Sequence, residues 1–316
     1  MTRKPALVFF VVLQFLLVFP IHGQQRQIEW DKVQIKPQKL SPNVYMLQAT
    51  GVNAAIGNVG VFVGDDGLVM VDCEYFELGP KLEAALKTIS EKPVRYVFNT
   101  HWHGDHTGGN AYFGKTATII AQENARKKME AGGKLFPPSP AIALPIITFS
   151  DQLSLHVGGG EMHAIHFAHG HTDTDSLVIF PGGSVVQTGD SFVNWEVPGF
   201  PAIDQDTDGS GGVQGEIALA EYIISNAPDD VKVIPGHGVL GSKNDLAKEL
   251  AVLKDTRAAV RLGIDQGKSL DQLMQEKVLA KWEYLNESHH IQSDVYLGRL
   301  YKELTQGRAG TAASAR

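Results

Sequence analysis

Short apolar runs divide the chain into two successive series of strands and helices. In the first half, continuous or alternating apolar positions predict strands at 33–35, 44–48, 60–63, 68–71, 94–98 and 117–120. Apolar residues at helical spacing predict helices over 78–89 and near 122–129. In the second half, the same patterns predict a helix near 216–225 and strands at 146–149, 152–157, 161–167, 176–180, 184–188 and 231–235.

This order of elements predicts a mixed α/β (α+β) fold. Two sheets are expected to pack face to face, with helices on the outer side of each, within one domain over 28–242. The helical pattern over 243–306 predicts a C-terminal helical extension, and 307–316 is expected to be a frayed tail. Glycine and proline predict irregular loops at 132–145 and 194–212.

The first 23 residues have the pattern of a secretory signal peptide. Arg3 and Lys4 precede an apolar run over 6–19, and the small residue Gly23 follows. The run is short for a membrane span and polar residues come after it, so we expect cleavage and no stable membrane anchor. An uncleaved anchor is the alternative. The pattern predicts a periplasmic or secreted protein.

Charge and cysteine content exclude several classes of partner and site. The chain has 28 basic and 35 acidic residues, and loss of residues 1–23 leaves 26 basic residues and a formal charge of −9. An acidic protein of this kind is not expected to bind nucleic acid or an anionic membrane surface. Cys73 is the only cysteine, which excludes an intrachain disulfide and a cysteine zinc knuckle.

Four metal-type ligands follow directly after the strand predicted at 94–98. They are His101, His103, Asp105 and His106. Residues two apart in an extended segment point the same way, so His101 and His103 can bind one ion, while Asp105 and His106 can reach a second. A lone loop histidine is usually only solvated, but four such ligands within six residues predict a metal site.

A metal site at strand ends also needs ligands from distant strands. Histidine or aspartate follows three further apolar runs: His169 and His171 after 161–167, Asp190 after 184–188, and His237 after 231–235. Each alone is a weak signal, because aspartate is common in turns and histidine in loops. Together with the first cluster they complete two ligand sets.

These residues resemble the metallo-β-lactamase-fold hydrolase superfamily. The motifs stand in the family order: His101-x-His103-x-Asp105-His106, Gly170-His171-Thr172, Thr188-Gly189-Asp190 and Pro235-Gly236-His237-Gly238. Asp72, at the end of the strand predicted at 68–71, matches the structural aspartate of the family. The resemblance spans about 44–238 and implies a four-layer αβ/βα sandwich, with the helical extension outside it.

The resemblance also implies the ligand sets and the metals. The first metal would be bound by His101, His103 and His171, and the second by Asp105, His106 and His237, with Asp190 bridging. Two Zn²⁺ per chain are expected, and iron or manganese can use the same ligands. His171 is preferred to His169 because Thr172 completes the Gly-His-Thr pattern. Asp173 and Asp175 are expected to accept hydrogen bonds from a ligand imidazole.

The implied activity is hydrolysis of a small molecule. Two metals make hydroxide available at neutral pH, and Asp105 is expected to orient this nucleophile and move its proton. Familiar lactam-cleaving members place cysteine or serine where this chain has Asp190. An aspartate at this position resembles the lactonase, thioesterase and phosphodiesterase branches. Export nevertheless favours an extracellular ester, lactone or β-lactam as the substrate. An iron-dependent sulfur dioxygenase and a phosphodiesterase are the alternatives.

Two weaker patterns concern the surroundings of the site. Trp102, Trp195 and Phe200 are candidates for lining a substrate pocket, although loop aromatics are more often packing residues. Alternating aspartates over 204–208 resemble the start of a calcium loop. Gly215 occupies the twelfth position, where an EF-hand needs glutamate, so a solvated acidic loop is the preferred interpretation.

Overall fold

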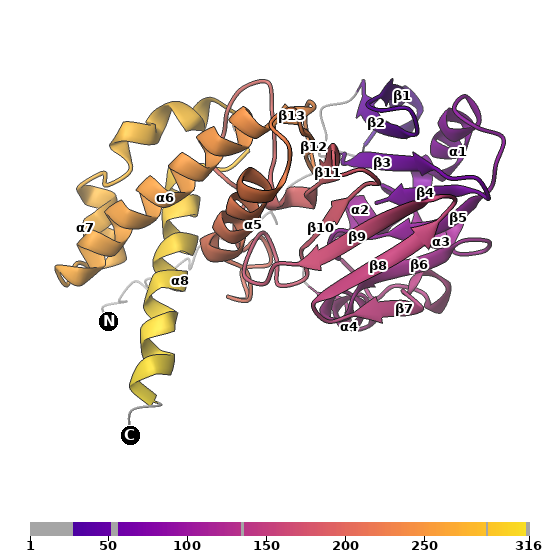
Figure 1. The fold of residues 1–316 in the computed structure, drawn as a ribbon. Helices are drawn as coiled ribbons and strands as arrows, with labels where there is room; N and C mark the ends of the chain where they lie inside the picture. Colours follow the sequence, from indigo (N-terminus) through magenta and orange to yellow (C-terminus); the bar gives the residue numbers. More distant parts are fainter. Residues whose placement is uncertain (1–27, 52–55, 134–135, 289, 314–316) are drawn as a thin grey trace, which may run out of the picture.

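A computed structural model describes residues 28–51, 56–133, 136–288 and 290–313. Within these ranges the strands form two sheets, and helices cover them, so the predicted α/β fold is confirmed (Figure 1). The predicted signal peptide lies outside the described residues and stays a prediction. In the described part of the chain, no helix has the length and apolar character needed to cross a membrane.

The first sheet has the strand order β1-β2-β3-β4-β5-β6-β7. Its strands are β1 (Gln34–Lys39), β2 (Val44–Thr50), β3 (Asn58–Val63), β4 (Leu68–Val71), β5 (Val94–Phe98), β6 (Thr118–Gln122) and β7 (Ile147–Phe149). Strands β1 to β4 are antiparallel neighbours, whereas β4 to β7 are parallel. Its helices and short 3-10 turns are η1 (Trp30–Lys32), η2 (Phe76–Leu78), α1 (Gly79–Lys87), α2 (Gly104–Thr107), α3 (Asn110–Phe113), α4 (Glu123–Ala131) and η3 (Ala141–Ala143).

The second sheet has the order β13-β12-β11-β10-β9-β8. Its strands are β8 (Gln152–Val157), β9 (Gly160–His166), β10 (Ser176–Ile179), β11 (Val185–Gln187), β12 (Lys232–Ile234) and β13 (Gly241–Ser242). A short turn, η4 (Gly189–Ser191), and α5 (Val213–Asn226) connect β11 to the parallel strand β12. The patterns did not predict β13, α2 or α3, because two to four residues are too short to show a period.

Strand β4 shows why the sheets stack between helices. Its side chains alternate: Val69 and Val71 pack in the core between the two sheets, whereas Leu68 and Met70 pack toward α1. All four are buried, so each contributes roughly 1.5–3 kcal/mol from loss of water contact. The second sheet repeats this arrangement, with α5 on its outer face. The layers are therefore helix, sheet, sheet and helix.

The C-terminal extension adds a second apolar core beside this sandwich (Figure 1). It consists of α6 (Lys243–Asp265), α7 (Leu270–Gln275), η5 (Ala280–Ser288) and α8 (Ser293–Ala313). Phe200 and Ile203, from the long loop after η4, are buried in this core. Helix α8 continues to Ala313, past position 307 where we expected the chain to fray.

The strand directions bring the predicted ligand segments to one edge. β4 and β5 are parallel, so their carboxyl ends meet at the same edge of the first sheet. In the second sheet, β9, β11 and β12 run in one direction, since β10 is antiparallel to both β9 and β11. Backbone hydrogen bonds from Ser176 to Thr100 and from Asn58 to Gly236, both 2.8 Å, join the two sheets there.

Helix α5 carries a buried carboxylate. Glu216 is only 1% exposed, and neither of its oxygens has a hydrogen-bond partner among the described residues. Burial raises the pKa of Glu216 well above its ordinary value, and the nearby carboxylates of Glu249, Asp175 and Glu303 raise it further. The folded protein therefore favours the protonated side chain.

This burial predicts a pH-dependent gain in stability for Glu216→Gln. The folded protein keeps a proton that the unfolded chain releases above pH about 4.5, so wild-type stability falls as pH rises from there. The neutral amide avoids this loss, and we expect the melting temperature to rise by about 2 °C or more at pH 8, with no gain at pH 4. The exposed Glu221→Gln, on the same helix, is the control. Equal shifts at both pH values would contradict the prediction.

Candidate metal centre

Asp72 organises the segment that follows β5. It adopts a left-handed backbone conformation, with φ of 62°, which is rare outside glycine. Its carboxylate accepts hydrogen bonds from Thr100 N and Thr100 Oγ1, both at 2.8 Å, and from His106 Nδ1 at 3.0 Å. The buried carboxylate thus ties both ends of the histidine segment to β4, as expected for the structural aspartate.

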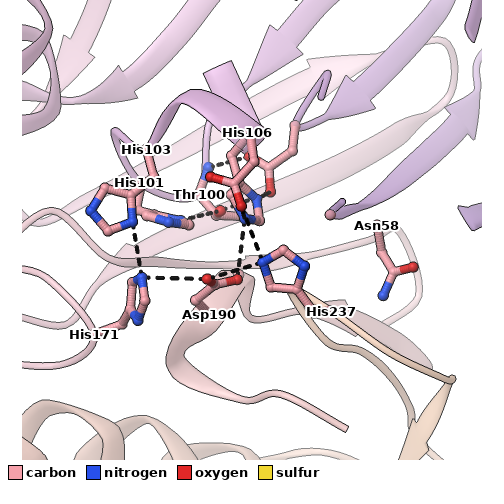
Figure 2. Close-up of polar contacts among 12 residues, drawn as sticks. Asn58, Thr100, His101, His103, His106, His171, Asp190 and His237 are labelled. Carbon is pink, nitrogen blue, oxygen red and sulfur yellow. Dashed lines mark hydrogen bonds and ion pairs between the residues drawn. The ribbon is translucent and has the colours of Figure 1, made fainter. Parts of the chain in front are cut away.

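The first ligand group combines the two sheets. His101 and His103 come from the segment after β5, and His171 from the loop between β9 and β10. One nitrogen from each ring lies within 4.8 Å of the others, and all three residues are buried. The closest approach is 3.0 Å, between His171 Nε2 and His103 Nδ1 (Figure 2).

The second group consists of Asp105, His106 and His237, whose ligand atoms also lie within 4.8 Å of one another. Asp105 Oδ2 is 3.3 Å from His237 Nε2 and 3.8 Å from His106 Nε2. Asn58 braces the loop around His237, because its Nδ2 donates to Pro235 O at 3.0 Å and Gly238 O at 3.1 Å (Figure 2 shows both side chains).

Asp190 lies between the two groups (Figure 2). Its Oδ2 is 3.4 Å from His171 Nε2 and 3.2 Å from His237 Nε2, and its Oδ1 is 3.2 Å from His106 Nε2. Gly236 permits this approach, since a Cβ there would meet Asp190 Oδ1 at 1.8 Å. The structure therefore brings all seven predicted ligands together, with Asp190 at the shared position.

In each of the five ligand histidines, a hydrogen bond holds the outer nitrogen, that is, the ring nitrogen that points away from the centre. The partners are Thr100 Oγ1 for His101 Nδ1 (3.1 Å), Asp206 Oδ1 for His103 Nε2 (2.7 Å), Asp72 Oδ2 for His106 Nδ1 (3.0 Å), Ala202 O for His171 Nδ1 (2.7 Å) and Ile56 O for His237 Nδ1 (3.0 Å). A ring that donates its outer N–H presents its other nitrogen as a lone pair. In their neutral form, all five rings therefore direct a lone pair toward the centre.

The donor atoms of the centre fit bound metal. His101 Nε2 is buried without a hydrogen-bond partner in the described chain, and His106 Nε2 and Asp190 Oδ1, although 3.2 Å apart, do not form a hydrogen bond of acceptable geometry. Such atoms are costly unless a bound group satisfies them. Imidazole and carboxylate donors suit zinc, and they also accept iron or manganese.

The charge distribution favours cations at the second group. Burial alone would lower the pKa of His237, but the carboxylates of Asp190 and Asp105 outweigh it and raise the pKa to about 10. Burial likewise opposes ionisation of Asp190, yet His237 and His106 hold the pKa of this carboxyl well below its usual range. His101 differs, because burial keeps its pKa well below the ordinary value. Carboxylates thus attract positive charge to this centre.

Two positions correct the sequence interpretation. Asp173 and Asp175 do not accept a hydrogen bond from a ligand imidazole: Asp173 pairs with Lys128 at 3.1 Å, and Asp175 accepts from Thr172 N at 3.1 Å and Ser191 Oγ at 2.6 Å. Their carboxylates instead brace loops beside the ligands, because Lys128, Thr172 and Ser191 already engage them.

Asp206 supplies the imidazole contact that was expected of those residues. The sequence signal was the run of alternating aspartates, which we considered as a calcium loop. Asp206 and Asp208 pair with Lys128 Nζ at 2.8 and 3.0 Å, and Asp204 lies 3.8 Å from Lys302 Nζ. Among the described residues, no metal-ligand group includes any of the three, so the calcium alternative gains no support.

His169, the rival of His171, lies apart from the centre. It is exposed, and its Nδ1 bonds to Ser210 O at 2.8 Å.

Two cavities are lined by residues that contact the ligands, although none of the seven ligands lines either cavity. One, of about 430 Å³, is lined by Trp102, Lys128 and Asp206 on the side of His103. The other, of about 380 Å³, is lined by Trp195, whose ring stacks on His237 with centroids 5.4 Å apart. Phe200 lines neither cavity, because it packs on Tyr296 in the extension core.

The contact with His103 predicts the effect of Asp206→Asn. An amide can turn its NH₂ toward the ring and destabilise the tautomer that leaves Nδ1 free for metal. We expect zinc affinity at the first group to fall about 10–100-fold, measured by competition with a chelator. Asp208→Asn is the matched control, since Asp208 shares Lys128 but does not contact an imidazole. Unchanged affinity in the Asp206 variant would refute the assignment.

Comparisons with known proteins agree with this architecture. The family model "Metallo-beta-lactamase superfamily" matches residues 52–239. A metallo-beta-lactamase from Pontibacter korlensis has 18% identity and a TM-score of 0.59 over 70% of this chain and 99% of its own. The DIM-1 metallo-beta-lactamase has 18% identity and a TM-score of 0.57 over 71% and 99%.

A third solved structure matches this chain over only part of its own length. A variant of the sec-alkyl sulfatase PisA1 has 14% identity and a TM-score of 0.61, over 85% of this chain and 50% of its own. At such identities these likenesses concern the fold, while the family model covers more than half of the sequence. The chain therefore belongs to the metallo-β-lactamase superfamily of metal-dependent hydrolases.

Proposed function

We propose that this protein is an exported, zinc-dependent hydrolase that opens an ester, lactone or β-lactam bond of a small molecule. The observation that carries the proposal is the place of Asp190, whose oxygens lie within 3.4 Å of imidazoles from both ligand groups. A carboxylate shared in this way suits two adjacent ions. The pattern of residues 1–23 supports export.

Bound zinc ions would supply Lewis acidity and a nucleophile derived from water at neutral pH. The protein's own contribution centres on Asp105, which is buried beside His237 and His106. Burial alone would raise its pKa, but the two imidazoles outweigh burial and lower it. Asp105 is therefore ionised at neutral pH, so its carboxylate can orient water and accept a proton.

The surroundings of the centre support a small substrate. Trp102 and Trp195, which pack against the ligands His103 and His237, each line a cavity with the volume of a small-molecule site. Two of the similar structures are metallo-beta-lactamases and one is a sulfatase, which supports cleavage of a lactam or an ester. Asp190, where lactam-cleaving relatives place cysteine or serine, favours the lactone and ester branches.

Asp105→Asn tests the proton-handling role. We expect turnover to fall by about 10²–10⁴-fold because the amide cannot accept the proton, while the circular dichroism spectrum stays unchanged. Turnover would be measured on a chromogenic cephalosporin, a lactone, a carboxylic ester, a thioester and a phosphodiester. Asp65→Asn, on the exposed β3–β4 turn, is the control. Wild-type turnover of the Asp105 variant would overturn this role.

Metal content separates hydrolysis from the oxidative alternative. We expect two zinc ions per chain in protein purified without added metal, together with hydrolysis of a lactone, an ester or the cephalosporin in the panel. One iron per chain with oxygen consumption on a persulfide would favour a sulfur dioxygenase instead. Cleavage of the phosphodiester alone would place the enzyme in the phosphodiesterase branch.

A further inference from the structure

The loop from Ala202 to Val213 lies against the first ligand group. Ala202 O accepts the hydrogen bond from His171 Nδ1, and Asp206 Oδ1 accepts the one from His103 Nε2, both at 2.7 Å. A backbone hydrogen bond from Gln205 N to His171 O, at 2.8 Å, adds a third contact. The orientation of two of the three histidines in this group thus depends on one loop.

Helix α8 of the C-terminal extension holds the same loop from outside. Arg299 Nη1 donates to Ile203 O at 3.1 Å and also to Gln205 Oε1. One turn further along, Lys302 Nζ donates to Thr207 O at 2.7 Å. Residues three apart share a helix face, so both cations reach the loop from one side of α8.

The loop needs such support because its backbone is strained. Asp204 and Thr207 have φ of 42° and 58°, in the left-handed region that disfavours side chains with a Cβ, and most strongly the branched side chain of threonine. Residues in this conformation persist only where the surrounding structure fixes them. Lys302 contacts both of them, at Thr207 O and, at 3.8 Å, the Asp204 carboxylate.

We propose that α8 is a functional part of the metal centre, in which Arg299 and Lys302 are positioning residues that set the metal affinity of the His101–His103–His171 group. The second group is held differently. The outer nitrogens of its histidines bond to Asp72 and Ile56 O, neither of which belongs to this loop or to α8. Loss of the two cations therefore weakens the first site and spares the second.

The test is a cobalt titration of metal-free, full-length protein, followed by its d–d absorption. The double variant Arg299→Met/Lys302→Met is expected to bind cobalt about 10–100-fold more weakly at the first site, with unchanged affinity at the second. His171→Ala and His237→Ala identify the spectrum of each site. The control is Lys277→Met/Lys281→Met, which removes two exposed lysines of the same extension that pair with Glu283 and Asp255.

A conservative variant separates positioning from general stability. Arg299→Lys/Lys302→Arg keeps both cations and should recover most of the first-site affinity. Equal weakening of both sites, a control variant as weak as the double variant, or unchanged first-site affinity would each overturn the proposal. The proposal rests on the metal centre and not on the substrate. If the wild-type protein bound no cobalt, the metal centre itself would be overturned. If the double variant bound cobalt normally at both sites, only the role of α8 would be overturned.

Discussion

The hydrogen bond at the outer nitrogen of each imidazole is the interaction on which this structure depends. The five acceptors come from distant parts of the chain. Asp72 follows β4, Thr100 follows β5 and Ile56 precedes β3, while Ala202 and Asp206 lie in the loop between η4 and α5. Only a fold that brings two sheet edges together can collect them. The parallel pairs β4–β5 and β11–β12 and the backbone bonds between the sheets provide that meeting point.

Much of this arrangement could be predicted from sequence, because the strands are buried and the ligands follow them directly. The Val94–Phe98 strand has the predicted bounds, and the motifs located all seven residues that meet at the centre. What the sequence could not show are contacts across long separations. Asp206 lies 103 positions from His103, and its only sequence signal suggested calcium, whereas Asp173, near His171 in sequence, lacks the expected contact.

Lysine and arginine side chains have a consistent place around this acidic centre. Lys128 neutralises Asp206, whose carboxylate faces His103, and Arg299 and Lys302 hold the backbone of the same loop. Hydrogen bonds to Lys128 and His103 outweigh burial and hold the pKa of Asp206 below its usual range. Lys128 and Lys302 thus pair with the carboxylates of Asp206 and Asp204, and Arg299 bonds to uncharged oxygens of the loop.

The apolar core of the C-terminal extension shows that the extension and the sandwich share buried side chains and are not separate domains. The family match ends at residue 239, and the sequence suggests a boundary near Ser242. Yet Phe200 and Ile203, which precede that boundary, are buried among side chains of the extension. A chain shortened at the boundary would expose them to water, so the sandwich and its tail are expected to unfold cooperatively and to be inherited together, rather than as exchangeable modules.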